Sequence, residues 1–128
     1  MRLILDTHAL VWAVDDPSKL GPDAAKSIDD PANELLLSAA SIWELAIKIR
    51  LGKLTLSLPF REWADRAIAD LNVIILPITV EYAAAQTRLP DHHGDPFDRM
   101  LVAQSQVEGV PITSADAEFD KYGVTRLW

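Results

Sequence analysis

Four or five acidic residues stand where their side chains can meet, although long stretches of sequence separate most of them. They are Asp6, Glu44, Asp95, Asp98 and Asp116. Asp6 directly follows the apolar run 3–5, and Asp116 shortly follows the apolar run 110–113. Clustered carboxylates repel one another unless they share a proton or a cation, and Mg²⁺ and Mn²⁺ prefer hard oxygen ligands of this kind. The acids therefore indicate a site in which a bound metal activates water for attack on a phosphodiester.

Most of these acids also have an ordinary structural explanation. Glu44 follows Ser41 by three residues, which is typical of a helix capping box, and it precedes Lys48 by four, which predicts a surface ion pair. Asp95 stands before a proline, as a helix N-cap does. Asp6 is the hardest to explain in this way, because a carboxylate at the end of a buried strand is costly without a partner.

The elements that must position these acids alternate between strand and helix. Short apolar runs predict buried strands at 3–5, 35–37, 73–76, 110–113 and 124–127. Helical patterns occupy the segments between them, beginning at Thr7, Ala24, Ser41, Phe60, Thr79, Phe97 and Ala115. This alternation predicts one α/β domain over residues 1–128, with a parallel sheet covered by helices on both faces. In such sheets the functional crevice lies beyond the carboxyl ends of the strands.

Composition narrows the function classes further. The chain has 128 residues, a net charge of −7 and no cysteine, which excludes disulfides, thiolate metal sites and a cysteine nucleophile. No apolar run is long enough to span a membrane, so we expect a soluble, cytoplasmic protein. The acidic balance argues against a general binder of phosphate backbones, but metals held by carboxylates would reverse the local charge.

Four segments of the sequence resemble the motifs of PIN-domain nucleases, and they occur in the same order. They are residues 6–12 (DTHALVW), 38–48 (SAASIWELAIK), 95–104 (DPFDRMLVAQ) and 113–116 (TSAD). The combination is similar to the VapC toxins of type II toxin–antitoxin systems, and the resemblance covers nearly the whole chain.

The resemblance implies a three-layer α/β/α fold with a central parallel sheet and a Mg²⁺- or Mn²⁺-dependent endoribonuclease. The residues that fall on the family's acidic positions, and that would be both the metal ligands and the catalytic residues, are Asp6, Glu44, Asp98 and Asp116. Ser114 falls where the family often has a Thr or Ser that orients a site carboxylate, and Thr7 and Asp95 would support the site. The resemblance also implies an RNA substrate, a homodimer and a cognate VapB-like antitoxin, and no membrane association is expected.

Basic and aromatic residues near these motifs are candidates for binding surfaces. The basic residues that could guide RNA are Lys48, Arg50, Lys53 and Arg99, although a solvated helix face would look the same. Trp12, Trp43, Ile47 and Leu51 could belong to the core or to an apolar groove for a partner helix. We expect Trp43 in the core and leave Trp12 open. The loop residues His92 and His93 could reach a substrate phosphate or could simply be solvated.

Two other function classes remain open at this point. A non-catalytic RNA- or protein-binding module would keep the same fold and its acidic patch. A phosphoryl-transfer domain would also place an aspartate after the first strand. The haloacid-type phosphatases, however, have a second aspartate two residues later, where this chain has His8.

Overall fold

Five parallel strands form the centre of the protein, and they lie in the order β3-β2-β1-β4-β5. The computed structural model describes residues 1–92 and 94–128. The strands are β1 (Arg2–Leu5), β2 (Glu34–Ser38), β3 (Ile74–Leu76), β4 (Ile112–Thr113) and β5 (Arg126–Leu127). Because β1 pairs with both β2 and β4, the first strand lies at the middle of the sheet and Asp6 follows it there.

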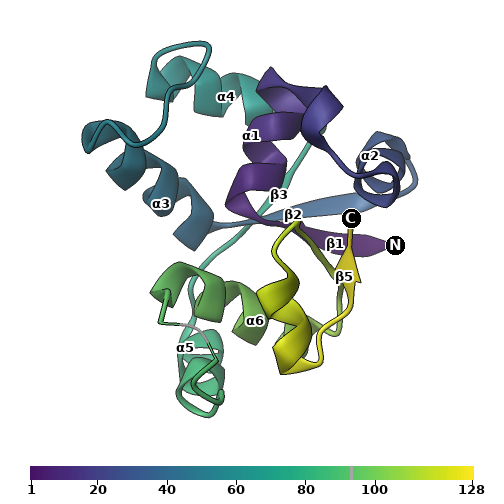
Figure 1. Ribbon diagram of the computed structural model, residues 1–128, viewed down its shortest axis with the longest axis vertical. Coiled ribbons are helices and arrows are strands. Elements are labelled where there is room, and N and C mark those ends of the chain that lie inside the picture. Colours follow the sequence, from purple (N-terminus) through teal and green to yellow (C-terminus); the bar gives the residue numbers. More distant parts are fainter. Residues whose placement is uncertain (93) are drawn as a thin grey trace.

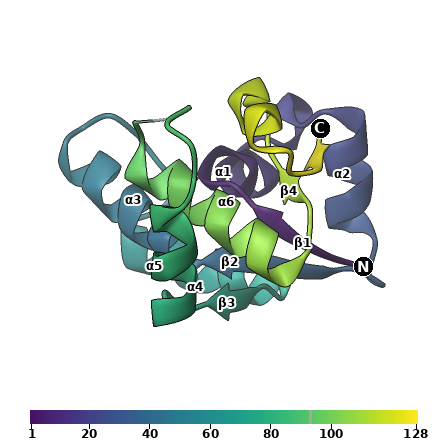
Figure 2. The same ribbon diagram turned by 90° about the horizontal axis from the view of Figure 1, so that it is seen from below.

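Helices cover both faces of the sheet, as the alternating pattern predicts. They are α1 (Thr7–Asp15), the 3₁₀ turn η1 (Pro17–Lys19), α2 (Pro22–Asp29), α3 (Ala39–Arg50), α4 (Phe60–Leu71), α5 (Val80–Thr87), α6 (Pro96–Glu108) and the 3₁₀ helix η2 (Ala117–Tyr122). Figure 1 shows α1, α2 and α4 above the strands and α5 and α6 below them. Figure 2 shows the sheet from below, with β1, β2 and β3 side by side. The predicted three-layer α/β/α fold is confirmed.

Two hydrophobic cores lie on the two faces of the sheet, and the alternation along each strand divides its side chains between them. Leu3 and Leu5 enter the core beneath α1 and α4, together with Trp63. Ile4 and Ile112 enter the opposite core beneath α6. Successive side chains of a strand point to opposite faces, so a strand that is covered on both faces must be apolar throughout. This explains why the runs in the sequence are continuous.

Polar residues at the strand ends begin the helices that follow. Asp6 and Ser38 are the N-caps of α1 and α3, and their side chains accept hydrogen bonds from backbone N–H groups at 2.7 Å and 3.1 Å. The predicted start of the first helix at Thr7 is confirmed, although Asp6 and not Thr7 is its cap. The start predicted at Ser41 is two residues late, because α3 begins as soon as β2 ends. Each of these caps therefore stands at the carboxyl edge of the sheet.

Other predicted bounds differ more toward the C-terminus. The helix from Phe60 to Leu71 is confirmed. The strands predicted at 110–113 and 124–127 are shorter than expected. Only two residues of each, Ile112–Thr113 and Arg126–Leu127, pair in the sheet. The predicted helix at 115–119 is a 3₁₀ helix that begins two residues later.

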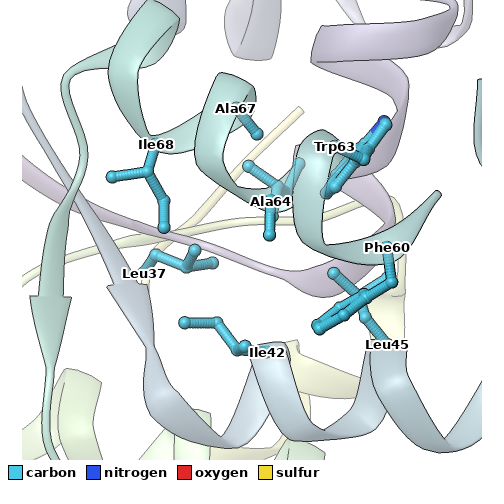
Figure 3. Close-up of a pocket in the computed structure, with 9 residues that line it drawn as sticks. Leu37, Ile42, Leu45, Phe60, Trp63, Ala64, Ala67 and Ile68 are labelled. Atoms are coloured by element: carbon cyan, nitrogen blue, oxygen red, sulfur yellow. The ribbon is translucent and has the colours of Figure 1, made fainter. Parts of the chain in front are cut away.

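A small apolar cavity remains between α3, α4 and the sheet. Figure 3 shows the side chains that surround it, and the labelled ones come from β2, α3 and α4. Leu10 of α1 also lines the cavity. Its volume is about 10 Å³, and its lining offers no polar partner for a water molecule. The cavity is a packing gap beside Trp63, whose indole Nε1 donates to a carboxylate oxygen of Asp15 at 2.9 Å.

We predict that Trp63→Ala lowers the free energy of unfolding by about 3–5 kcal/mol, because it removes a fully buried aromatic side chain. Trp63 is 1% exposed, whereas Trp43 is 63% exposed. The matched control Trp43→Ala should therefore cost less than about 1 kcal/mol. Urea denaturation measures both. Equal losses for the two variants would contradict this account of the core.

Candidate active site

The four predicted acids come from four different elements and meet beyond the carboxyl edge of the sheet. Asp6 follows β1, Glu44 lies in α3, Asp98 lies in the first turn of α6 and Asp116 precedes η2. The charges of the other three raise the pKa of Asp98. The fold therefore brings together side chains that are up to 110 positions apart in the sequence.

Asp6 is buried and held by two hydrogen bonds. Its carboxylate is 7% exposed, accepts the backbone N–H of Ala9 at 2.7 Å and also accepts the hydroxyl of Ser114. Burial raises the pKa of Asp6, and these hydrogen bonds together with His8 act in the opposite direction without cancelling that rise. Ser114 thus makes the contact with a site carboxylate that the family resemblance implies.

Glu44 is held from two sides. The hydroxyl of Thr7 donates to one carboxylate oxygen at 2.5 Å, and the ammonium group of Lys48 lies 2.9 Å from the other. The carboxylate itself is buried. The predicted capping box with Ser41 is wrong, because α3 begins at Ala39 and Glu44 lies in its second turn. The ion pair with Lys48 is present, but only its lysine end approaches the surface.

The pKa of Asp98 reports the repulsion between the acids of the site. Burial, followed by the charges of Asp95, Glu44, Asp116 and Asp6, raises the pKa of Asp98 to about 7. A carboxylate that is repelled by its neighbours favours a proton or a cation beside it. The site is therefore arranged to accept positive charge.

Asp95 and Asp116 both act as helix caps. One oxygen of Asp95 accepts the backbone N–H groups of Phe97 at 2.8 Å and Asp98 at 3.2 Å, so its predicted role as N-cap of α6 is confirmed. Asp116 caps η2, and its own N–H donates to the hydroxyl of Ser114 at 3.0 Å. The Ser114 hydroxyl therefore links the backbone of Asp116 to the carboxylate of Asp6.

Arg99 is buried inside the protein, whereas a residue that contacts RNA is expected at the surface. Its side chain is buried, and the guanidinium donates to the carbonyl oxygens of Gln86 at 3.1 Å, Leu89 at 3.2 Å and Pro90 at 2.9 Å. These bonds fasten the end of α5 to α6. The expectation that Arg99 guides RNA does not fit this geometry, because its donors face the backbone of the protein.

Trp43 also differs from expectation. Instead of lying in the core it is 63% exposed, and its ring meets that of Phe97 edge-on, with centroids 5.7 Å apart and an interplanar angle of 79°. The helical spacing places it on the side of α3 that faces away from the sheet. The core positions of this helix are taken by smaller residues, including Leu45.

Trp12 and His92 make contacts with other aromatic rings. Trp12 is partly buried between His8 and Trp128, with ring centroids 5.6 Å and 5.7 Å away. His92 packs against Tyr122 at 5.1 Å. The expectation for His93 lies outside the described residues.

Arg126 is a contributor that the sequence analysis missed. Its Nη1 donates to the carbonyl oxygen of Ser114 at 3.1 Å, and its Nε donates to Asp120 at 3.0 Å. It thereby ties β5 and η2 to the residue that orients Asp6. No motif signals this role, because an arginine near the end of a chain has no distinctive spacing.

The donor set suits a hard divalent cation, although it is not a closed cage. Carboxylate oxygens are the ligands that Mg²⁺ and Mn²⁺ prefer, and Mg²⁺ commonly keeps several waters and takes one or two carboxylates. Among the residues that the structure describes, no three His, Asp or Glu side chains form a ready ligand set. A metal here would therefore bind with water in part of its coordination shell.

A parallel α/β sheet with an acidic site at its carboxyl edge defines the class of protein. The PIN domain family matches residues 3–124, and the chain belongs to that family. The chain is 29% identical to Ribonuclease VapC22 of Mycobacterium tuberculosis over 115 residues, which cover 89% of this chain and 86% of that protein. The predicted resemblance is therefore confirmed.

Solved structures share the fold at low sequence identity. VapBC2 from Rickettsia felis, bound to a DNA fragment from its promoter, matches with a TM-score of 0.75 and 12% identity over 98% of this chain and 97% of that chain. FitAcB from Neisseria gonorrhoeae matches with a TM-score of 0.63 and 17% identity over 97% and 95%. No helix in the described part of the chain is both long and apolar enough to cross a bilayer.

We predict that Asp98→Asn stabilises the metal-free protein more at pH 8 than at pH 5. A carboxyl group whose pKa rises from about 4 to about 7 on folding binds more protons in the folded state, so its contribution to stability is lost as pH increases through that window. The gain at pH 8 should be about 1–2 kcal/mol, less than the full shift because the group is partly exposed. Urea denaturation in EDTA at both pH values measures it, and a gain independent of pH would contradict the account.

Proposed function

We propose that this protein is a metal-dependent endoribonuclease that acts as the toxin of a toxin–antitoxin pair. The observation that carries the proposal is the convergence of carboxylates that, together with the partial burial of Asp98, raises the pKa of Asp98 to about 7. The likeness to a ribonuclease over most of the chain supports RNA as the substrate. The cleavage would take place at the carboxyl edge of the sheet.

Asp6, Asp98 and Asp116 would hold Mg²⁺ or Mn²⁺, with Glu44 contributing directly or through water. When bound, the ion supplies charge stabilisation for a phosphodiester and makes water a better nucleophile at neutral pH. The catalytic residues of the chain are these same four acids, and their part is to fix the charge pattern that aligns the phosphate and the attacking water.

Neighbouring side chains keep that charge pattern in place. Ser114 fixes the orientation of Asp6, and Thr7 and Lys48 fix Glu44 from opposite sides. Such supporting contacts are worth about 10- to 100-fold in metal affinity or activity. Asp95 contributes by capping α6, which places Asp98 in the first turn of that helix.

The basic residues that would approach the RNA backbone are Lys48, Arg50 and Lys53. Arg50 and Lys53 are exposed at the end of α3 and just after it, whereas Lys48 is shared with Glu44. Their charges would offset part of the repulsion between a polyanion and a protein of net charge −7.

We predict that Asp6→Asn and Asp116→Asn each reduce RNA cleavage by at least about 100-fold, because each removes a charge needed to hold the metal. Both replacements are nearly isosteric, so circular dichroism should show an unchanged fold. Asp65→Asn is the control, since that exposed acid pairs with Arg61 on α4. If either site variant cleaves at the wild-type rate, its role is wrong, and a toxic protein without any cleavage would favour a non-catalytic binding module.

We also predict that Mn²⁺ at millimolar concentration raises the melting temperature of the wild-type protein but raises that of Asp6→Asn much less. The reason is that a cation relieves repulsion among the carboxylates only where the ligands remain. Thermal melts with increasing Mn²⁺ test this, with Asp65→Asn again as control. The same shift in all three proteins would mean that the ion binds elsewhere.

A VapB-like antitoxin is the partner we propose, and a homodimer is the assembly. The structural relatives include VapBC-1 from nontypeable Haemophilus influenzae, with a TM-score of 0.58 and 13% identity over 98% of this chain and 96% of that chain. A partner tail that carries Arg or Lys could pair with the carboxylates and compete with the metal. A tail that folds on binding could also cover neighbouring apolar surface.

We predict that replacing the basic tail residue of the partner by Ala weakens inhibition of RNA cleavage by about 10-fold or more, because a charge-assisted contact at a buried carboxylate is lost. Co-purified pairs with and without the replacement supply the comparison. A tail without any Arg or Lys that still inhibits fully would show that steric blocking is the mechanism.

A further inference from the structure

An exposed aromatic pair lies next to the carboxylate site and has no part in the function described so far. Trp43 projects from α3 and Phe97 from the start of α6, and their rings meet edge-on. The edge-on contact holds the indole in place while 63% of the residue stays exposed. A rigid, solvent-facing indole of this kind is suited to stacking against a flat ligand.

A cavity of about 230 Å³ lies beside this pair and borders the carboxylate site. Its lining includes Glu44, Lys48, Leu51, Lys53, Asp95 and Phe97. Glu44 belongs to the cavity and to the carboxylate cluster, so a ligand in the cavity would lie directly next to the reacting centre. The apolar surface of Ile47, Leu51, Pro96 and Phe97 is thus combined with two ammonium groups and two carboxylates.

The two lysines differ in what they can offer a ligand. Lys48 is 2.9 Å from Glu44 and its charge is largely compensated. Lys53 makes no ion pair with an acidic residue in the described part of the chain. Lys53 is therefore the group at this cavity that is able to contact a phosphate.

We propose that Trp43, Phe97 and the adjoining cavity bind one unpaired nucleotide of the RNA, next to the bond that is cut. The base would stack on the aromatic pair, and Lys53 would contact its phosphate. Aromatic platforms combined with basic groups are how proteins bind single-stranded nucleic acid without reading its sequence. A base within a duplex is already stacked on both faces and cannot use the platform, so the subsite selects unpaired RNA. This inference rests on the proposed ribonuclease function.

Charge favours this occupant over a protein helix or a second copy of the chain. A groove for an apolar helix face would be lined by apolar side chains throughout, whereas four of the eight residues that line this cavity are charged, namely Glu44, Lys48, Lys53 and Asp95. A second copy would bring its own acids and lysines to the same place. A nucleotide matches both parts of the surface, since it joins an aromatic ring to an anion.

The test is the binding of a short, mixed-sequence single-stranded RNA that contains 2-aminopurine, measured in EDTA by anisotropy and by quenching of the 2-aminopurine emission on stacking. The same sequence annealed into a duplex is the comparison ligand. We expect Trp43→Ala to weaken single-strand binding about 5- to 150-fold and to abolish the quenching. Trp43→Phe should restore most of both, and Val80→Ala, which alters an 86% exposed apolar residue on α5, should change neither.

Lys53→Ala should lower the slope of log affinity against log salt by about 0.7, the value for one phosphate contact on a single strand. If the wild-type protein cleaves RNA and Trp43→Ala binds single-stranded RNA as tightly as the wild type, the subsite is overturned and the ribonuclease function stands. Loss of a dimer in Trp43→Ala, measured by size-exclusion chromatography, would show a contact between copies and would also overturn it. A wild-type protein that neither binds nor cleaves RNA overturns the ribonuclease function together with the subsite.

Discussion

Repulsion between carboxylates is the constraint on which the arrangement of this protein depends. Asp6 and Glu44 are buried within range of Asp98, whose pKa their charges raise. The fold offsets this cost with neutral donors, since Ser114 and Thr7 give their hydroxyls to the two buried carboxylates. A hydroxyl supplies a hydrogen bond without cancelling the charge, so the negative potential that attracts a cation is kept. Lysine or arginine at all these places would have neutralised the site.

The sheet topology supplies the geometry that this repulsion requires. Parallel strands end at one edge, and each helix that follows begins there with a polar cap. In this protein the caps Asp6 and Asp116 are themselves members of the acidic cluster. A carboxylate that accepts one backbone N–H retains lone pairs for a second contact. The same residues thus end the strands, start the helices and form the site, which is why a chain of 128 residues can hold two cores and still devote one edge of its sheet to chemistry.

The features of the fold and the site that were predictable from the sequence are those that depend on the type of a residue and on its immediate neighbours in the chain. Continuous apolar runs define strands covered on both faces, and an acid directly after such a run must lie at the sheet edge. Contacts between residues that are distant in the sequence were not predictable. The guanidinium of Arg99, for example, donates to three backbone carbonyl oxygens, and no local sequence pattern indicates these bonds. Trp43 was misplaced because hydrophobicity alone does not distinguish the buried side of a helix from the exposed side when both carry large apolar residues.

The balance of charge around the site explains why an aromatic surface belongs beside it. The protein has a net charge of −7, and its lysine nearest to the acids, Lys48, is already paired with Glu44. Phosphate contacts alone would therefore give weak and strongly salt-dependent affinity for RNA. Stacking does not depend on net charge, and every base offers a face for it. A surface that combines the indole of Trp43 with the single ammonium group of Lys53 can hold an RNA strand near a negative site without filling that site with cations, and so leaves the carboxylates available for the metal.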